Sequence, residues 1–268
     1  MEKGEIYRAL EDDFMATFIR ELIPGILHNF ANPLNGIMGR SKLLQRRIDE
    51  HVRKLEEQYP EVASNLAEDL KRMKNDIRSV SAESDSFFEM FRDVSGKFYA
   101  LAARGEDRIN LSQLLSAEMR FANFYLDFKH ELRKETDFDV ELPDFKGQTA
   151  DLSLAFWRLI RFAMNQAMQS QKREFFLATD HDDNHVSVTI KYSGEAMPER
   201  TIADALEFLE GGMNPLAKAS VDHGVILSLV VLNRYKAIIH ISTEGDASIL
   251  SIAIPYREQK NVKGEKFK

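Results

Sequence analysis

The sequence predicts an α+β fold in two parts, a long N-terminal α-helical hairpin followed by an α/β sandwich. Apolar residues recur in alternating steps of four and three from Ile23 to Leu55, and a second pattern of this kind runs from Leu66 to Phe98. Beyond residue 105, shorter helical patterns are interleaved with strand-like alternation. Two long helices followed by a mixture of helices and strands indicate a bundle element and a separate layered domain.

The first helical pattern resembles a coiled-coil seam. Its positions are Ile23, Leu27, Phe30, Leu34, Ile37, Ser41, Leu44, Ile48 and Leu55, with His51 in the one remaining slot. The loop Glu57–Pro60 interrupts the pattern. The second seam then follows at Leu66, Leu70, Met73, Ile77, Val80, Ser84, Phe87, Phe91, Val94 and Phe98. The two helices are therefore expected to fold back on each other as a hairpin.

A helical hairpin buries one stripe of each helix and leaves the other side of its seam uncovered. Two copies that close into a four-helix bundle cover both sides, so we expect a homodimer. In the alternative arrangement, the C-terminal domain covers the seam within one chain.

The polar segment Arg104–Arg108 separates the hairpin from a region of different rhythm. We place a helical domain at residues 1–104, the sandwich at 105–256 and a polar tail at 257–268. In the sandwich we expect a helix capped by Asn110 or Ser112 and running to Leu126, a strand at Asp137–Leu142, a helix at Ala150–Gln169, hairpins at 175–192 and 238–254, and helices at 199–209 and 221–235. The strands look antiparallel, with the helices on one face of the sheet.

Composition limits the possible functions. The chain has 268 residues, 44% of them hydrophobic, no cysteine, and no apolar run of membrane-spanning length. We expect a soluble cytoplasmic protein that has no contact with a membrane and no thiolate metal site. The net charge of -7, from 43 acidic and 36 basic residues, argues against nucleic acid as a partner.

One histidine of the first helix is a candidate for chemistry. His28 follows the seam residue Leu27, about 100° further around the helix, and Asn32, Asn35 and Gly39 follow it on the same face. An accessible neutral imidazole is a nucleophile towards phosphorus, although a lone histidine on a helix is most often an ordinary surface residue.

The residues around His28 resemble the phosphoacceptor box of two-component histidine kinases, which reads His, an acidic residue, two variable positions, Asn or Thr, Pro and Leu. His28, Asn32, Pro33 and Leu34 match it in order, and Pro33 is expected to bend the helix one turn beyond the histidine. Asn29 stands where the family has an acidic base, and an amide does not take up a proton. The resemblance implies that Asn32 orients water for hydrolysis of a receiver phospho-aspartate.

The layout of residues 109–256 is similar to the ATP-binding domain shared by histidine kinases and gyrase. Phe162 stands where that superfamily holds magnesium with asparagine, and an aromatic ring offers no oxygen to a hard cation. Asn165, three residues on, is a weaker candidate for a displaced ligand.

Two further boxes of that superfamily are degenerate. Tyr192 replaces the adenine-reading aspartate and only Gly194 remains of its glycines, while Asp222 would place negative charge beside phosphates in a box that keeps Gly224. We therefore expect no ATP binding and no cofactor in this chain, with Mg²⁺ supplied by a receiver partner.

The segment Asp180–His185 is rich in acidic residues and histidine. It can be interpreted as a metal cluster or as a solvated hairpin tip, and the turn between two strand patterns favours the tip. We predict no metal site in this chain.

The resemblance implies a histidine-containing phosphotransferase, which exchanges a phosphoryl group between His28 and receiver-domain aspartates without ATP. Asn32 and Asn29 would assist His28, and Pro33, Asn35 and Gly39 would form the docking face. Three alternatives stay open: a response-regulator phosphatase that uses the Asn32 face, a divergent active kinase, and a non-catalytic dimeric scaffold that sequesters a receiver domain.

Overall fold

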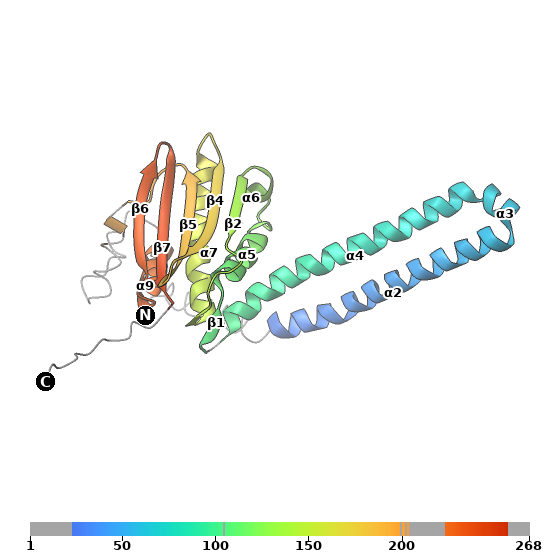
Figure 1. Cartoon of the computed structure of the whole chain (residues 1–268), viewed down its shortest axis with the longest axis horizontal. Helices are drawn as coiled ribbons and strands as arrows, with labels where there is room; N and C mark the ends of the chain where they lie inside the picture. The colour runs from blue at the N-terminus through green and yellow to red at the C-terminus, as the bar shows by residue number, and fades with distance from the viewer. Residues whose placement is uncertain (1–22, 104, 199, 202, 204–222, 257–268) are drawn as a thin grey trace, which may run out of the picture. The chain divides into compact units, whose positions relative to one another are not determined.

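The computed structural model describes residues 23–103, 105–198, 200–201, 203 and 223–256. The chain divides into two compact units between Tyr99 and Ala100, and each is described by itself. Together they combine long helices with a five-stranded sheet, a mixed architecture in keeping with the α+β prediction (Figure 1).

The N-terminal unit is built on two long helices. α2 covers Ile23–Gln58 and α4 covers Ala67–Ala102, so both predicted helices are confirmed. The predicted break falls at Tyr59, after which a short helix that the sequence did not predict, α3, spans Pro60–Asn65. Proline is favoured at the first position of a helix, where no N–H is needed, so Pro60 ends one helical run and starts the next. No described helix combines the length and the apolar character needed to cross a membrane.

α2 and α4 pack together through recurring heptad positions. Leu27, Leu34 and Ser41, seven residues apart, are buried on α2, and Ile77 and Ser81 are buried on α4. Two ion pairs join the antiparallel helices: Lys42 Nζ lies 3.0 Å from Asp85, and Lys74 Nζ lies 3.9 Å from Asp49. Both pairs fit the same alignment of α2 against α4.

A second heptad position on each helix stays exposed. On α2 these side chains are Phe30, Ile37 and Leu44, which are 60%, 52% and 48% exposed. On α4 they are Met73, Val80 and Phe87, which are 42% to 54% exposed, and Leu66, just before α4, continues the row at 41%. We call these two rows the apolar stripes. Large apolar side chains in regular rows are uncommon on the surface of a monomer, and they mark a surface that another structure covers.

The C-terminal unit is a sheet with helices on one face (Figure 1). Its strands lie in the order β2-β4-β5-β7-β6, with β2 parallel to β4 and the other pairs antiparallel. The strands are β2 Arg133–Phe138, β4 Glu174–His181, β5 His185–Ser193, β6 Ile238–Glu244 and β7 Ala247–Pro255. The helices are α5 Leu111–Ala122, α6 Leu126–His130, α7 Thr149–Gln169 and α9 His223–Arg234.

The core of this unit lies between the sheet and α7. One row of paired residues crosses four strands as Leu177, Ile190, Leu250 and Ile241, all of them buried. Several side chains of α7 are completely inaccessible, namely Phe156, Leu159, Ile160 and Met164. The alternation on the strands and the helical period on α7 therefore bury their apolar faces against the same core.

Several boundaries differ from the sequence prediction. The strand predicted at Asp137–Leu142 is wrong in position, because β2 ends at Phe138 and the next residues form a turn in which Glu141 N–H donates to Asp139 Oδ1. The helix predicted to reach Leu126 ends at Ala122. The strands were expected to be antiparallel, but β2 pairs in parallel with β4. A short antiparallel pair, β1 Asp107–Ile109 with β3 Phe145–Gly147, was not predicted. The helix expected at 199–209 falls mostly outside the described residues.

Gly194 is required where β5 leaves the sheet. Its φ of 117° is unfavourable for residues with a side chain, and an added Cβ would lie 2.5 Å from the Gln166 carbonyl oxygen of α7. We expect Gly194→Ala to lower the free energy of unfolding by about 3 kcal/mol, through backbone strain and steric overlap. Gly245 also has a positive φ, 61°, but no neighbour within 4 Å of its Cβ position, so Gly245→Ala should cost about 1 kcal/mol. Urea unfolding of the two variants measures the difference, and equal losses would contradict the packing argument.

Candidate functional site

His28 lies on the solvent side of α2. Its neighbour Leu27 is only 8% exposed, whereas His28 and Asn32, one helical turn later, are both exposed. Phe30, the first residue of the α2 apolar stripe, is two residues from each of them, and two residues correspond to about 200° of rotation. His28 and Asn32 therefore lie on the opposite side of α2 from the stripe.

The other residues predicted for the docking face are also exposed, but Pro33 lies about 140° around α2 from His28 and about 60° from Phe30, on the side of the apolar stripe. Pro33, Asn35 and Gly39 are exposed, and α2 continues without interruption through Pro33. A Cβ added to Gly39 would meet nothing within 4 Å, so the surface beside it is open. Asn29 is part of α2, but its side chain lies outside the described residues. An accessible imidazole, an amide one turn away and small neighbours form a site that another protein can approach.

The charged side chains in the first part of α2 all carry a positive charge. From Ile23 to Ile48 the sequence contains no Asp or Glu, and its charged residues are Arg40, Lys42, Arg46 and Arg47. All four are exposed. Lys42 is paired with Asp85 of α4, so the three arginines carry the remaining positive charge of this segment.

In the C-terminal unit, two of the degenerate nucleotide positions contact each other. Phe162 on α7 meets Tyr192 at the end of β5, with ring centroids 6.1 Å apart and planes at 85°. Tyr192 is 2% exposed, its hydroxyl oxygen accepts a hydrogen bond from Met197 N–H at 3.2 Å, and burial raises its pKa. An edge-to-face aromatic pair thus occupies positions where the resemblance implied a magnesium ligand and an adenine-reading carboxylate.

The remaining residues of the degenerate nucleotide boxes are Gly194, Gly224 and Asp222. The carbonyl of Gly194 accepts a hydrogen bond from Ser248 Oγ at 3.0 Å. Gly224 lies in α9, and a Cβ added there would be 2.4 Å from Nε of Arg158 on α7. Asp222 lies outside the described residues. Gly194 is therefore required for the close approach of the chain after β5 to α7, whereas a Cβ at Gly224 would meet only the flexible side chain of Arg158.

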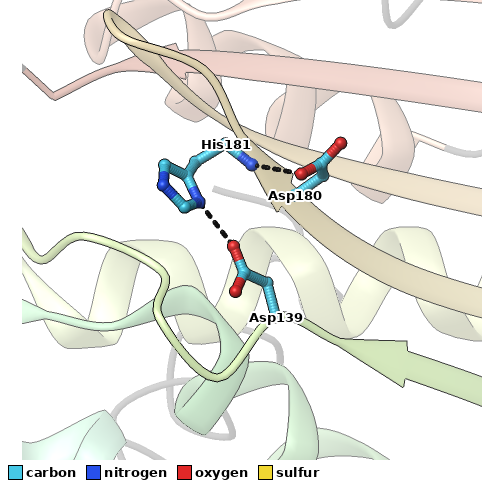
Figure 2. A group of neighbouring side chains, drawn as sticks. All are labelled: Asp139, Asp180 and His181. Carbon is cyan, nitrogen blue, oxygen red and sulfur yellow. Dashed lines mark hydrogen bonds and ion pairs between the residues drawn. The ribbon is translucent and has the colours of Figure 1, made fainter.

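A polar cluster that sequence analysis did not assemble joins the end of β2 to the end of β4. Asp139 Oδ2 lies 2.5 Å from Nδ1 of His181, and Asp180 Oδ1 accepts the backbone N–H of His181 at 2.8 Å (Figure 2). One potential metal-ligand atom from each of the three residues lies within 4.8 Å of the others. Both oxygens of Asp139 are engaged, one by His181 and the other by Glu141 N–H, which has the larger effect in lowering the pKa of Asp139.

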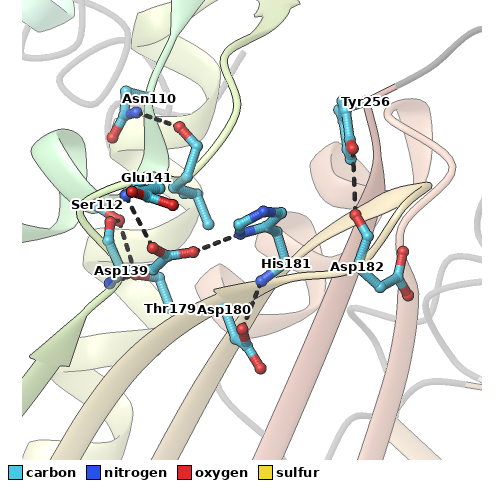
Figure 3. A network of polar contacts seen from close by, with 10 residues as sticks. Asn110, Ser112, Asp139, Glu141, Thr179, Asp180, His181, Asp182 and Tyr256 are labelled. Carbon is cyan, nitrogen blue, oxygen red and sulfur yellow. Dashed lines mark hydrogen bonds and ion pairs between the residues drawn. The ribbon is translucent and has the colours of Figure 1, made fainter.

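Hydroxyl groups extend this cluster into the core. Thr179 Oγ1 accepts the backbone N–H of Asp139 at 2.9 Å and lies 2.7 Å from Ser112 Oγ, which also contacts the Asp139 carbonyl (Figure 3). The cluster thereby holds the turn after β2 against β4 and α5. At the tip of the β4–β5 hairpin, Asp182 Oδ1 accepts the N–H groups of Asn184 and His185, so the predicted turn is confirmed. Because Asp139 and His181 are 42 residues apart, no local sequence pattern links them.

No protein-family model matches the sequence. No curated protein matches it either.

Several solved histidine kinases are similar in fold. Acinetobacter baumannii histidine kinase AdeS is 14% identical with a TM-score of 0.44, over 69% of this chain and 84% of that one. The catalytic domain of histidine kinase ThkA is 12% identical with a TM-score of 0.47, over 57% of this chain and 97% of that one. Full-length ShkA, in complex with AMPPNP, is 14% identical with a TM-score of 0.42, over 88% and 46%.

The Asp139 cluster predicts a specific dependence of stability on pH. Because the folded state lowers the pKa of Asp139, its ionised form stabilises folding above the ordinary carboxyl value of 3.8, and this contribution is lost as the pH falls through the lower folded value. We expect Asp139→Asn to destabilise the protein at pH 6 and to flatten the decline in stability below pH 4. Urea midpoints from pH 6 to pH 3 measure this, with Asp137→Asn, an exposed residue of β2, as the control. Parallel declines for wild type and Asp139→Asn would contradict the assignment.

Proposed function

We propose that this protein is a histidine-containing phosphotransferase, in which His28 exchanges a phosphoryl group with aspartates of receiver domains without using ATP. The observation that carries the proposal is the placement of His28 on α2: it is exposed, one turn from Asn32, and on the side of the helix away from the apolar stripe. A nucleophile that must reach the phosphorylated aspartate of another protein needs this accessibility.

The proposed transfer conserves atoms and charge. A ring nitrogen of neutral His28 attacks the phosphorus of the receiver's aspartyl phosphate, so an N–P bond forms while the acyl O–P bond breaks. The receiver carboxylate leaves with the bonding electron pair, and the proton on the other ring nitrogen passes to solvent as the phosphoimidazole becomes neutral. The reverse reaction passes the group to a second receiver, so no base at Asn29 is required.

The charge of α2 supports a receiver domain as the partner. Arg40, Arg46 and Arg47 follow the candidate site along the helix, and no carboxylate precedes Asp49 in the described part of α2. Lys42 lies in the same segment but is paired with Asp85 of α4. An aspartyl phosphate is an anion, and an acidic surface around it would be attracted to this half of the helix. Asn35 and Gly39 are small residues and lie on the His28 face between His28 and the cationic segment.

The apolar stripes support a homodimer. Both α2 and α4 leave a heptad row uncovered beside the row they bury against each other, and two copies can pack these rows into a four-helix bundle. His28 and Asn32 lie on the opposite side of α2 from the stripe, so dimer formation leaves them accessible. Dimerisation and phosphotransfer therefore use different faces of the same helix.

The contact between Phe162 and Tyr192 supports independence from ATP. It places two aromatic rings, neither of which offers a carboxylate or amide oxygen, at the positions where the resembled superfamily holds magnesium and reads adenine. A chain that receives its phosphoryl group from a receiver domain does not need those groups.

A receiver phosphatase is the second candidate, because Asn32 is exposed one turn from His28. Its amide can orient a water molecule towards an aspartyl phosphate docked on the same face. In this case hydrolysis depends on Asn32 and continues without His28.

Substitutions at His28 and Asn32 distinguish these two activities. We expect His28→Ala to abolish transfer between receiver domains without loss of helicity, and Asn32→Ala to slow hydrolysis of phospho-aspartate about 100-fold if water is oriented there. The measurement follows phosphate from receiver domains phosphorylated with acetyl phosphate, using His130→Ala, an exposed histidine of the other unit, as the control. Transfer that persists in His28→Ala would overturn the proposal, and binding of receivers with no phosphate flux would favour a scaffold.

Incubation with ATP tests the proposed independence from nucleotide. We expect no gain of a phosphoryl group in intact mass at neutral pH after exposure to Mg-ATP, and no nucleotide-dependent rise in melting temperature, because binding to the folded state alone would stabilise it. Neutral pH preserves acid-labile phosphohistidine. A mass gain that disappears in His28→Ala would identify a working kinase instead.

A further inference from the structure

A cavity lies within the N-terminal unit, at the end of the hairpin where α3 joins α2 to α4 (Figure 1). Its volume of about 510 Å³ is of the order found for small-molecule sites in proteins. The base of the cavity is apolar, because Val52 and Ala63 are buried and Leu70 is half-buried. The cavity can therefore cover the apolar part of a ligand.

One wall of this cavity carries positive charge. Lys71, Asn75 and Arg78 follow one another on α4 at steps of four and three residues, so they lie on one side of the helix. Lys74 lines the cavity beside them. Lys71 and Arg78 are exposed, and neither has an ion pair or a hydrogen bond with another residue in the part of the chain that the structure describes. Their charged groups are therefore accessible to a ligand.

The cationic wall lies away from the apolar stripe of α4. Lys71 precedes the stripe residue Met73 by two positions, and Arg78 precedes Val80 by two positions. Two positions correspond to about 200° around the helix. A second copy that packs against the stripe therefore leaves the cavity open.

Two carboxylates lie close to the cationic wall, and both are far from Arg78 or already paired. Asp49 is paired with Lys74 at 3.9 Å, and Glu56 is the one carboxylate among the described residues that line the cavity. Glu56 is seven residues from Asp49 towards α3, whereas Arg78 is four residues from Lys74 in the opposite direction, so about 16 Å of helix axis separates Glu56 from Arg78. Glu56 thus balances Lys71 at the α3 end, and positive charge remains at the Arg78 end.

The other nearby carboxylates do not neutralise Arg78. Asp76 precedes Arg78 by two residues and lies about 200° around α4 from it, and Asp69 has the same relation to Lys71. Glu61 belongs to α3, at the far end of the cavity from Arg78. Four more carboxylates are each paired with a lysine or arginine at 2.9 to 3.9 Å, namely Glu50, Glu57, Glu68 and Asp85.

We propose that this cavity binds an organic anion, which places one sulfonate, phosphate or carboxylate group at Arg78 and an apolar body over Val52 and Leu70. A guanidinium group presents two parallel N–H donors to two oxygens of such a group, and the amide of Asn75 can add a third donor. The apolar body gains free energy by leaving water for the base of the cavity. The site is separate from His28 and does not depend on dimer formation.

Fluorescence titration of the full chain with anilinonaphthalene sulfonate tests the proposal. This probe joins one sulfonate to an aromatic body and becomes fluorescent in apolar surroundings. Phenylnaphthylamine has the same aromatic body without the sulfonate, so it measures the apolar contribution alone. We expect Arg78→Gln to weaken binding of the sulfonate about tenfold, through loss of a charged hydrogen bond, and to leave binding of the uncharged probe unchanged.

Two further variants locate the bound probe. Arg72→Gln removes the same charge from another side of α4, where Arg72 is paired with Glu68 at 3.6 Å, so this variant should bind the sulfonate as the wild type does. Ala67 is exposed and lines the cavity, so Ala67→Leu should narrow the cavity without burying a new side chain in the core, and it should weaken both probes. Far-UV circular dichroism checks that each variant keeps its helices.

The proposal has definite contrary outcomes. Equal affinity of the sulfonate for wild type and Arg78→Gln would overturn the anion site. Equal affinity of both probes for wild type and Ala67→Leu would place the probes outside the cavity, for example on the apolar stripes, and would also overturn the proposal. So would a wild-type chain that gives no rise in fluorescence with the sulfonate.

Discussion

The arrangement of the hairpin follows from one constraint: two helices in contact cover only one face of each other. α2 and α4 place Leu34 and Ile77 in their shared seam, and the neighbouring heptad row of each helix has nothing within the pair to pack against. The remaining face of α2 is polar and holds His28. The helix thus has one face for its hairpin partner, one for a further structure and one open to solvent, and the sequence assigns each residue to a face through its heptad position.

Sequence predicts the parts of this fold that have long periodic patterns. The seams of α2 and α4, the apolar face of α7 and the β4–β5 hairpin each span enough residues for the period to identify the element. The prediction from the sequence failed around Asp139. There an alternation of charged and apolar residues resembles a strand, but the backbone turns. The turn is stabilised by Thr179 and His181, residues about 40 positions away. Interactions between distant segments decide such short elements, and a local pattern does not contain them.

The placement of His28 and Asn32 on one face of a helix could be predicted from the sequence for a related reason. His28 and Asn32 are one turn apart on a single helix, so their relative placement depends only on helix geometry. Asn29 has no described side chain, and its replacement of an acidic residue remains evidence from the sequence alone. The contact between Phe162 and Tyr192 joins α7 to β5, and no local spacing gives it. Sequence predicted that both residues depart from the nucleotide boxes, whereas only the structure brings them into contact.

The surroundings of the remaining glycines also bear on how the degenerate nucleotide boxes are interpreted. A glycine retained in a degenerate nucleotide box is easily taken as a sign of retained nucleotide binding. Gly194 has a positive φ, and a Cβ added there would overlap the backbone carbonyl of Gln166 on α7. The backbone therefore requires this glycine with or without a nucleotide. At Gly224 an added Cβ would meet only the side chain of Arg158, which can move. Phe162 and Tyr192, the positions at which the resemblance implies ligand contacts, instead pack against each other. A glycine that the backbone requires, such as Gly194, is therefore no evidence for nucleotide binding, because packing alone explains it.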